Sequence, residues 1–458
     1  MKFAPRRTIE DLGSAFFDPV AAADFPQTIL RFRNDRAAAS IGLDWLTDAD
    51  WIGHFGRFVA IPGSLGTPLA LRYHGHQFRS YNPDLGDGRG FLFAQATDAS
   101  GRLMDLGTKG SGTTPWSRAG DGRLTLKGAV REVLATEMLE ALGVDTSRTL
   151  SVVETGEALE RGDEPSPTRG AVLVRLSHGH IRYGSFQRLA ALGDADGMAR
   201  LTAYVLANYF ATTDAPDPYA VLIVHAVTNA ARQAAAMMAA GFVHGVLNTD
   251  NINITGESFD YGPYRFAQSW DPGFTAAYFD HHGLYSFGRQ PEALQWNVFQ
   301  LAGALRLVAP LDSLKPALEA FGERYTGALT AALLTRLGVI PRDPGSDRAL
   351  AEALVTALEA SRTDLDRFWF DWRGGKRRAP GYDAPEFASF VERLEAYAPA
   401  GPLDHPYWSD PAPCGLPIAE IEAIWSRIAA TDDWSAFDAK VAAIRRMGAA
   451  MTGGAAAA

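Results

Sequence analysis

The stretch that decides the fold reads His244-Gly245-Val246-Leu247-Asn248-Thr249-Asp250-Asn251, and Asp260-Tyr261-Gly262 follows nine residues after its end. It opens a loop-rich segment, residues 244–289, that is dense in Asn, Asp, Gly and aromatic residues. The segments on either side, Tyr219–Ala240 and Asn297–Ala309, are Ala-rich and apolar with helical spacing. A loop of this length inside a helical domain usually carries function. We therefore expect a functional site in this segment.

The polar residues of this stretch keep part of the spacing found in protein-kinase catalytic loops. Those loops read His-x-Asp-Leu-x-x-x-Asn, in which the Asp takes the substrate's proton and the Asn holds a metal; a later D-F-G supplies an Asp for Mg²⁺. Here Asn251 and Asp260 stand at the metal positions, and Val246 stands at the position of the base. Valine cannot accept a proton. The chain therefore either binds ATP without catalysis or performs a different transfer, in which Asp250 could replace the lost base.

A lysine and a glutamate in the N-terminal half complete this pattern. A kinase small lobe needs a strand lysine that neutralises phosphates and a helical glutamate that holds the lysine. Lys109 follows a strand-like run, and Glu132 lies 23 residues later on an amphipathic helix, Leu124–Leu142, which Gly143 caps. Glu137 on the same helix is the alternative partner. A lone lysine near glycine is usually solvated surface, but together with the D-Y-G loop it favours phosphate binding.

Glycine-rich loops and arginines supply further candidate contacts to phosphate. Glycine lets backbone N–H groups approach phosphate oxygens, and arginine adds bidentate recognition. Each loop alone could equally be a hairpin turn, for which Asp-Gly is a favoured pair, and a strand arginine could equally serve a buried salt bridge. The candidates are Gly86, Gly88 and Arg89 in one loop, Asp121 and Gly122 in a second, and Arg175 and Arg182 on and after a strand-like run.

The two halves of the chain differ in character. Between residues 51 and 195, β-prone runs such as Phe91–Ala96 and Val172–Leu176 are separated by glycine. After residue 195 the chain is helical in period, including Leu314–Leu337 and Leu350–Phe368. We expect an α+β, protein-kinase-like bilobal fold with a strand-rich N-lobe and a mostly helical C-lobe. The expected units are 1–195 (an N-terminal extension and the N-lobe), 196–450 (the C-lobe with the catalytic and metal-binding loop and a divergent helical C-terminal region) and 451–458 (a flexible tail).

Composition narrows the class of protein. The chain has 458 residues, of which 47% are hydrophobic, so it has material for large cores. Its net charge of −10 argues against general nucleic-acid binding, which needs a basic footprint. The single cysteine, Cys414, excludes an intramolecular disulfide and fits a reducing compartment. The sequence shows neither a signal peptide nor an apolar stretch long enough to span a bilayer, so we expect a cytoplasmic protein without membrane or nucleic-acid partners.

Taken in order, these segments resemble the selenoprotein O (SelO) family of pseudokinases, which act as protein adenylyltransferases. The resemblance covers roughly residues 60 to 305, and its motifs are long and ordered. The matching stretches are Asn82–Arg89, Lys109–Arg118, Gly120–Arg123, Arg131-Glu132, Ser177–Phe186 and Gly241–Gly262.

The resemblance implies an activity and a role for each candidate residue. ATP would bind in a flipped orientation, and AMP would pass to Ser, Thr or Tyr hydroxyls of proteins while pyrophosphate leaves. Asp250 would accept the proton, and Asn251 and Asp260 would hold Mg²⁺ or Mn²⁺. Glu132 would hold the lysine. The nucleotide-contacting positions would be Gly86, Gly88, Arg89, Lys109, Asp121, Gly122, Arg175, Arg182 and Asp260.

Two alternatives and several departures remain beside this interpretation. A small-molecule or protein kinase shares the loop pattern, but Val246 argues against it; a silent ATP-binding scaffold is disfavoured by the retained metal ligands and Asp250. Family members often carry a C-terminal Cys or selenocysteine, whereas this chain ends in Gly-Gly-Ala-Ala-Ala-Ala, and 275–280 contains no cysteine. Redox gating by a disulfide within the chain is therefore excluded. After about residue 305 we recognise no family motif.

Overall fold

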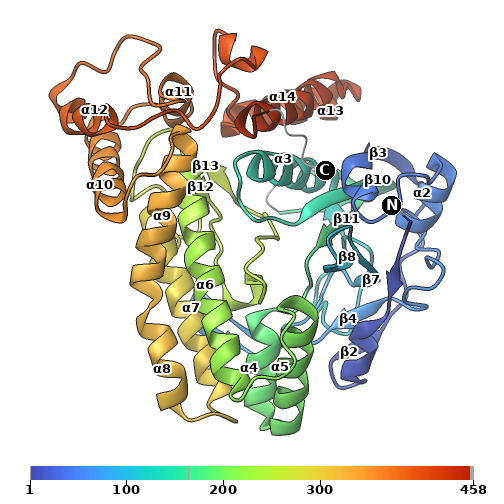
Figure 1. The fold of residues 1–458 in the computed structure, drawn as a ribbon. Helices are drawn as coiled ribbons and strands as arrows, with labels where there is room; N and C mark the ends of the chain where they lie inside the picture. Colours follow the sequence, from blue (N-terminus) through green and yellow to red (C-terminus); the bar gives the residue numbers. More distant parts are fainter. Residues whose placement is uncertain (1, 163, 454–458) are drawn as a thin grey trace.

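The computed structural model describes residues 2–162 and 164–453, which form a strand-rich lobe and a helical lobe (Figure 1). The segment predicted to carry the site lies between them, since residues 246–263 and residues of the first lobe line one cavity. The expected α+β, kinase-like bilobal architecture is confirmed. The boundary at residue 195 stays a prediction, and residues 454–458 of the expected tail lie outside the described residues.

The first lobe is built on one antiparallel sheet, whose strands follow the order β2-β4-β7-β8-β11-β10-β3, with β1 paired to β7 and β9 to β11. The predicted runs at 91–96 and 172–176 fall in β7 and β11. The strands are β1 (Pro5–Arg6), β2 (Phe17–Pro19), β3 (Ile29–Arg33), β4 (Leu69–Leu71), β7 (Leu92–Thr97), β8 (Leu103–Lys109), β9 (Leu124–Thr125), β10 (Arg148–Leu159) and β11 (Thr168–Ser177). Two short helices, α1 (Asp35–Ala39) and α2 (Asp48–Phe55), precede β4.

The long helix of this lobe is α3 (Leu126–Ala141), which packs against β10 and β11. The Thr125 side chain caps its start by accepting from Gly128 N. Gly143 follows its end with a φ of +78°, a conformation that favours glycine, so the predicted helix and its terminator are confirmed. Both faces of α3 are buried, which allows Glu132 and Glu137 to reach different neighbours.

The second lobe is organised around α6 (Pro218–Ala239), which packs against α7, α8 and α9. Its remaining helices are α4 (Tyr183–Leu192), α5 (Ala195–Tyr209), α7 (Gln290–Leu305), α8 (Leu311–Glu319) and α9 (Phe321–Leu337). The predicted helical segment 314–337 is interrupted at Ala320, where ψ is −5°. The predicted segment 350–368 ends its first helix at Ser361, because Arg362 adopts a φ of +50° and Asp364 caps a new helix.

The C-terminal part returns to the first lobe. After α10 (Pro344–Ser361), α11 (Leu365–Asp371) and α12 (Ala388–Leu394), helices α13 (Ile418–Thr431) and α14 (Ser435–Met451) lie over α3 (Figure 1). Helix α14 packs along α3, and Gly448 permits a close approach to Ala141. No helix among the described residues combines the length and apolar character needed to cross a membrane.

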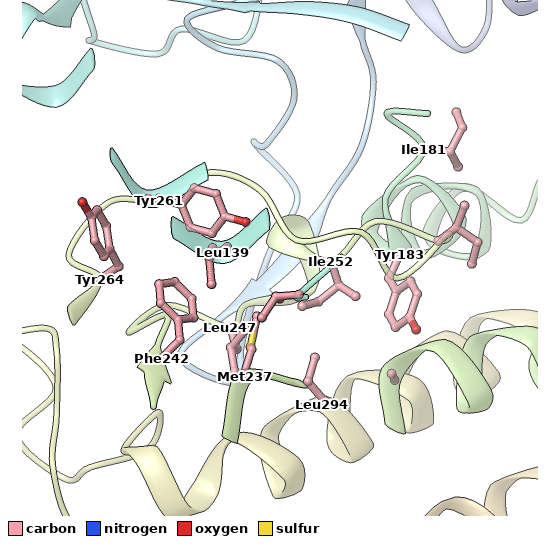
Figure 2. Packing of buried hydrophobic residues seen from close by; sticks show 14 of the residues in the cluster. Leu139, Ile181, Tyr183, Met237, Phe242, Leu247, Ile252, Tyr261, Tyr264 and Leu294 are labelled. Carbon is pink, nitrogen blue, oxygen red and sulfur yellow. The ribbon is translucent and has the colours of Figure 1, made fainter. Parts of the chain in front are cut away.

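The hydrophobic core continues beneath the D-Y-G segment. Figure 2 shows Tyr261 of the D-Y-G triplet grouped with Phe242 and Tyr264, with Leu139 of α3 beside them. The ring centroids of Tyr261 and Phe242 are 5.7 Å apart, in edge-to-face geometry. Phe242 belongs to the short strand β12 (Phe242–Val243), which pairs with β13 (Arg265–Phe266). The D-Y-G backbone is therefore anchored to both lobes through its tyrosine.

Candidate active site

A cavity of about 790 Å³ lies between the lobes, within the size range of small-molecule sites. Its walls come from the glycine-rich loops, β8 and β11 of the first lobe, and the segment 246–263 of the second lobe. With the exception of Glu132, which stands behind Lys109, every predicted site residue lines it: Gly86, Gly88, Arg89, Lys109, Asp121, Gly122, Arg175, Arg182, Asp250, Asn251 and Asp260.

Three cations converge on the carboxylate of Asp260. Arg175 from β11 forms a short ion pair with Oδ1, and Arg182, the N-cap residue of α4, donates to Oδ2 at 2.9 Å. Lys109, the last residue of β8, lies 3.5 Å from Oδ1. Burial alone would raise the pKa of Asp260, but Arg175, Lys109 and Arg182 hold it well below its usual range. The sequence left two roles open for Arg175, a buried salt bridge or a contact to phosphate. The structure shows the salt bridge, and its partner Asp260 is itself a predicted metal ligand, so Arg175 also lies at the predicted phosphate site.

Lys109 is held from the other side by α3. Its Nζ forms a short, buried ion pair with Glu132, which is 3% exposed. Glu137, the alternative partner, points to another part of the molecule and binds Arg445 instead. The structure therefore resolves the choice that the sequence left open.

The D-Y-G segment holds Asp260 in an unusual backbone conformation. Its φ is +63°, in the left-handed region that non-glycine residues rarely occupy. The next residue, Tyr261, is buried and its hydroxyl hydrogen-bonds to Thr146. Packing of the tyrosine thus fixes the strained turn that aims Asp260 into the cavity.

Asp250 lies in the short 3₁₀ turn η2 (Thr249–Asn251) and is 7% exposed. Among the described residues, no group donates a hydrogen bond to its Oδ1. Gln77 of β5 (Gly75–Gln77) contacts the carboxylate, and burial raises its pKa to about 6. Gly75 makes this approach possible, since a Cβ there would lie 2.9 Å from the Asp250 Cβ. A carboxylate with a free, buried oxygen is suited to accept a proton from a hydroxyl group.

Asn251 and Asp260 offer oxygen donors that suit Mg²⁺. The Asn251 amide nitrogen donates to Val246 O at 3.0 Å, which fixes the side chain and leaves its Oδ1 available. Within residues 2–162 and 164–453, no group of three or more His, Cys, Asp or Glu side chains could hold a metal. Mg²⁺ needs no such group, because it is commonly held by one or two protein oxygens, phosphate oxygens and water. The donor set therefore fits this ion.

The glycines of the loops are explained first by packing. A Cβ at Gly86 would lie 2.3 Å from Trp116, and one at Gly88 would lie 2.8 Å from Trp116 O. Gly122 adopts a φ of +69°, and a Cβ there would lie 2.2 Å from Gly112 O. Trp116 in turn donates from Nε1 to Asp18 at 2.9 Å. Trp116 thus packs against the first loop at the rim of the cavity, and its hydrogen bond to Asp18 fixes the indole there.

Two arginines lie at the rim of the cavity. Arg89 and Arg118 are exposed and line the cavity, and the described residues place no carboxylate within ion-pair distance of either. Asp121 behaves differently, because its carboxylate is bound by Arg161 at 2.8 Å. Of the predicted rim residues, Arg89 therefore remains free for an anion, whereas Asp121 is already engaged.

Several residues of the site escaped the sequence analysis. Asp87 accepts from Leu71 N at 3.0 Å and lies 3.4 Å from Arg182; burial raises its pKa. His180 accepts from Arg175 Nε at 3.1 Å and so orients that guanidinium. Asp87 stands between two predicted glycines, and His180 lies between two predicted arginines. Their position inside predicted motifs is the signal by which the sequence could have identified both residues. Gln77 carries no sequence signal, because a hairpin distant in sequence brings it to Asp250.

Comparisons with known proteins identify the family of the chain. A family model described as "Protein adenylyltransferase SelO" matches residues 1–384. The protein nucleotidyltransferase YdiU of Gloeobacter violaceus is 45% identical over 468 residues, covering 95% of this chain and 93% of its own. The same-named protein of Synechocystis is 50% identical over 337 residues, covering 72% and 70%.

Among solved structures, a Toxoplasma gondii rhoptry antigen kinase domain aligns with a TM-score of 0.27 and 13% identity, covering 64% of this chain and 83% of that one, which is too weak a likeness to support inference. The sequence relationship is decisive by itself, since the family model spans most of the chain and the Gloeobacter violaceus relative matches it nearly end to end. The expected family is confirmed: this chain belongs to the SelO family of protein adenylyltransferases.

Proposed function

We propose that the protein transfers AMP from ATP to Ser, Thr or Tyr hydroxyls of other proteins and releases pyrophosphate. The observation that carries this proposal is the pairing of two unlike features in one cavity. One is a cluster of buried cations around Asp260; the other is Asp250, whose buried Oδ1 has no donor among the described residues. The first suits a polyphosphate and the second suits a hydroxyl acceptor.

Binding of the triphosphate would redistribute the ion pairs of the cavity. Lys109, Arg175 and Arg182 share the single carboxylate of Asp260, so each retains capacity for phosphate oxygens. Arg89 and Arg118 add positive charge at the rim. When pyrophosphate leaves, negative charge develops on it, and cations fixed in advance stabilise that charge most effectively. Cations at both the floor and the rim favour pyrophosphate as the leaving group.

Proton removal would depend on Asp250. Val246, at the position of the kinase base, also lines the cavity and has no proton acceptor. Asp250 is near enough to the cation cluster for its backbone oxygen to accept from Arg182 at 2.6 Å. In this proposal its free Oδ1 takes the proton of the acceptor hydroxyl as the oxygen attacks the α-phosphorus and the bond to pyrophosphate breaks.

Asn251 and Asp260 would hold Mg²⁺, which when bound supplies charge neutralisation and orientation of the phosphates. Release of Asp260 from its three cations by the incoming triphosphate would free that carboxylate for the ion. In this proposal Mn²⁺ can take the place of Mg²⁺ at the same two residues. A cytoplasmic location also stays a prediction.

The test is transfer of label from ATP carrying ³²P at either the α or the γ position, with Mg²⁺ and a mixture of proteins as acceptors. We expect protein to be labelled from α-labelled ATP only. Label from γ-labelled ATP alone would establish a kinase and refute the proposal. Binding of ATP without transfer of either label would establish a silent scaffold.

A further inference from the structure

A short hairpin beside Asp250 is built with the wrong residues for its turn. Strands β5 and β6 (Ser80–Asn82) pair antiparallel with Gln77 opposite Ser80, so Phe78 and Arg79 form a two-residue turn. Their φ values are +49° and +63°. A turn with positive φ at both positions strongly favours Asn-Gly, and bulky residues there are strained. Such strain persists where the side chains themselves are needed.

The turn is tied directly to the catalytic loop. Phe78 N donates to Asn248 Oδ1 at 3.0 Å, and His76 N donates to Thr249 Oγ1 at 2.6 Å. The same Asn248 oxygen accepts from the hydroxyl of Tyr285 at 2.7 Å. The hairpin and the segment that follows D-Y-G are thus held in fixed positions relative to the loop that carries Asp250.

Exposed aromatic rings gather at this junction. Phe78 is 38% exposed, Phe279 is 41% exposed and Tyr278 is 81% exposed. The centroid of Phe78 lies 5.8 Å from that of Phe279 and 5.1 Å from that of buried Tyr285, and Tyr278 lies 5.1 Å from Phe279. We call Phe78, Tyr278 and Phe279, seated on Tyr285, the aromatic platform. A contiguous exposed apolar surface of this kind marks an interaction site more often than a scattered single residue does.

The distance between the aromatic platform and Asp250 determines which part of an acceptor protein can contact the platform. Gly75 lies against the Asp250 side chain, and Phe78 is three residues further along the same hairpin. An extended chain advances about 3.3 Å per residue, so the platform begins about 10 Å from the carboxylate along the strand. An acceptor hydroxyl at Asp250 would therefore place the side chains about two to three residues away from it over these rings.

We propose that the aromatic platform docks the acceptor protein, by binding a large apolar side chain that lies about two to three residues from the modified hydroxyl. This inference rests on the proposed function, since it assigns the surface to the acceptor of the same reaction. At the edge of the platform, Arg79 forms an ion pair with Glu292 at 2.8 Å and lies over the ring of Trp296. The polar edge and apolar centre match the usual anatomy of a protein-binding patch.

The first experiment measures binding of fluorescein-labelled peptides by the full-length protein with Mg²⁺ and a non-hydrolysable ATP analogue. Each peptide carries one serine among Ala, Gly and Lys, with Phe placed at successive positions on either side of it. We expect at least one Phe position within about three residues of the serine to bind about tenfold more tightly than the peptide without Phe. Equal affinities across the series would overturn the proposal.

Variants locate the effect on the platform. In Phe78→Ser/Phe279→Ser the preference for the Phe peptide should disappear, whereas Trp45→Ser, which alters an aromatic side chain that is 67% exposed elsewhere, should retain it. Replacing Phe78-Arg79 by Asn-Gly should also remove the preference, while the melting temperature stays equal or rises because the turn strain is relieved. A preference that survives in both variants would overturn the proposal.

Two further outcomes separate this proposal from its competitors. If the double serine variant changes the oligomeric state measured by light scattering while peptide affinities stay the same, the platform binds a second copy of the chain and the proposal is wrong. Transfer from α-labelled ATP to the peptides and to casein is measured in parallel. Absence of transfer to every acceptor, with the Phe preference intact, would refute the proposed function but support the docking surface.

Discussion

Helix α3 separates two buried ion clusters that differ in how completely their polar atoms are paired. The cleft cluster consists of Lys109, Arg175, Arg182 and Asp260, with Asp250 beside it. The helix lock lies on the other side of α3 and consists of Glu137, Asn34, Arg36 and Arg445. Both central carboxylates are largely buried, and the first cluster borders the cavity of about 790 Å³ between the lobes.

In the helix lock, both oxygens of Glu137 are fully used. Arg445 from α14 donates to them at 2.6 and 2.7 Å, and Arg36 and Asn34 each add a bond of 3.3 Å. In the cleft, by contrast, Asp250 Oδ1 and Arg182 Nε are buried without partners among the described residues. Buried polar atoms are normally paired, so a cluster that leaves two of them unpaired beside a cavity is shaped for a ligand. A cluster in which every buried polar atom is paired needs no ligand, so a structural role is sufficient to explain it.

The largest expected effect follows from removing the carboxylate on which the cleft cations converge. Asp260→Ala should lower AMP transfer by about 10³-fold or more, because the phosphates lose both a metal ligand and the residue that orders the cations. The measurement is label transfer from α-labelled ATP, with circular dichroism to confirm folding. Lys109→Ala should behave in the same way. Near-normal transfer in folded Asp260→Ala would refute its assignment as a metal ligand.

Asp250→Asn should separate activity from stability within the cleft. Loss of the proton acceptor should reduce transfer by about 10²- to 10⁴-fold. The folded state raises the pKa of this carboxyl to about 6, so the stability cost of Asp250 grows as pH rises from about 4 to about 6 and is fully present above that range. In nucleotide-free protein at pH 8, the variant should therefore be more stable by about 1–2 kcal/mol in urea unfolding. The gain should shrink as pH falls below about 6, where the folded wild-type carboxyl becomes protonated, and should vanish below about 4, where the unfolded chain is protonated as well.

A stability loss at pH 8, or unchanged transfer, would contradict the role given to Asp250. Asp87→Asn is a useful comparison, because burial raises that pKa as well but the residue holds Arg182 rather than an acceptor. It should lower the affinity for ATP more than the rate of transfer at saturating ATP.

The contrast between the clusters also explains what the sequence could predict. Asp250, Asn251 and Asp260 lie in one loop with kinase-like spacing, and Lys109 and Glu132 share a strand and a helix, so linear patterns were enough to find them. The α+β bilobal fold was predictable because strand and helix periodicities change near residue 195. Each of these signals is local in sequence.

The remaining features depend on contacts between segments far apart in sequence. Gln77 meets Asp250 through a hairpin 173 residues away, and Arg445 meets Glu137 across 308 residues. No local sequence pattern predicts that α14 packs over α3. The same is true of the strained turn at Phe78, whose residues predict no turn of this type. The sequence analysis therefore missed mainly tertiary contacts. These contacts include those of the residues that hold the predicted site residues in place.

Disruption of the helix lock should affect stability more than chemistry. Glu137→Ala leaves the guanidinium of Arg445 without its buried partner, which should cost about 3 kcal/mol of unfolding free energy. Because α3 also carries Glu132, transfer per folded molecule should fall, but by less than about tenfold. The matched control is Glu140→Ala on the same helix, whose carboxylate binds Arg36 in a more exposed pair and should cost below about 1 kcal/mol. A loss of activity in Glu137→Ala as large as in Asp260→Ala would show that the lock belongs to the catalytic machinery.

The smallest effect is expected at the rim, where a third ion pair is both complete and exposed. The side chain of Asp121 is 49% exposed and its partner Arg161 lies 2.8 Å away. Surface pairs contribute little to stability, and the pair leaves no buried atom unpaired. Asp121→Ala should therefore leave kcat unchanged, and the freed Arg161 should alter the KM for ATP by no more than about threefold at physiological salt. A large fall in kcat would mean that Asp121 contacts the reacting nucleotide, and that unpaired buried atoms do not suffice to separate functional from structural ion clusters in this protein.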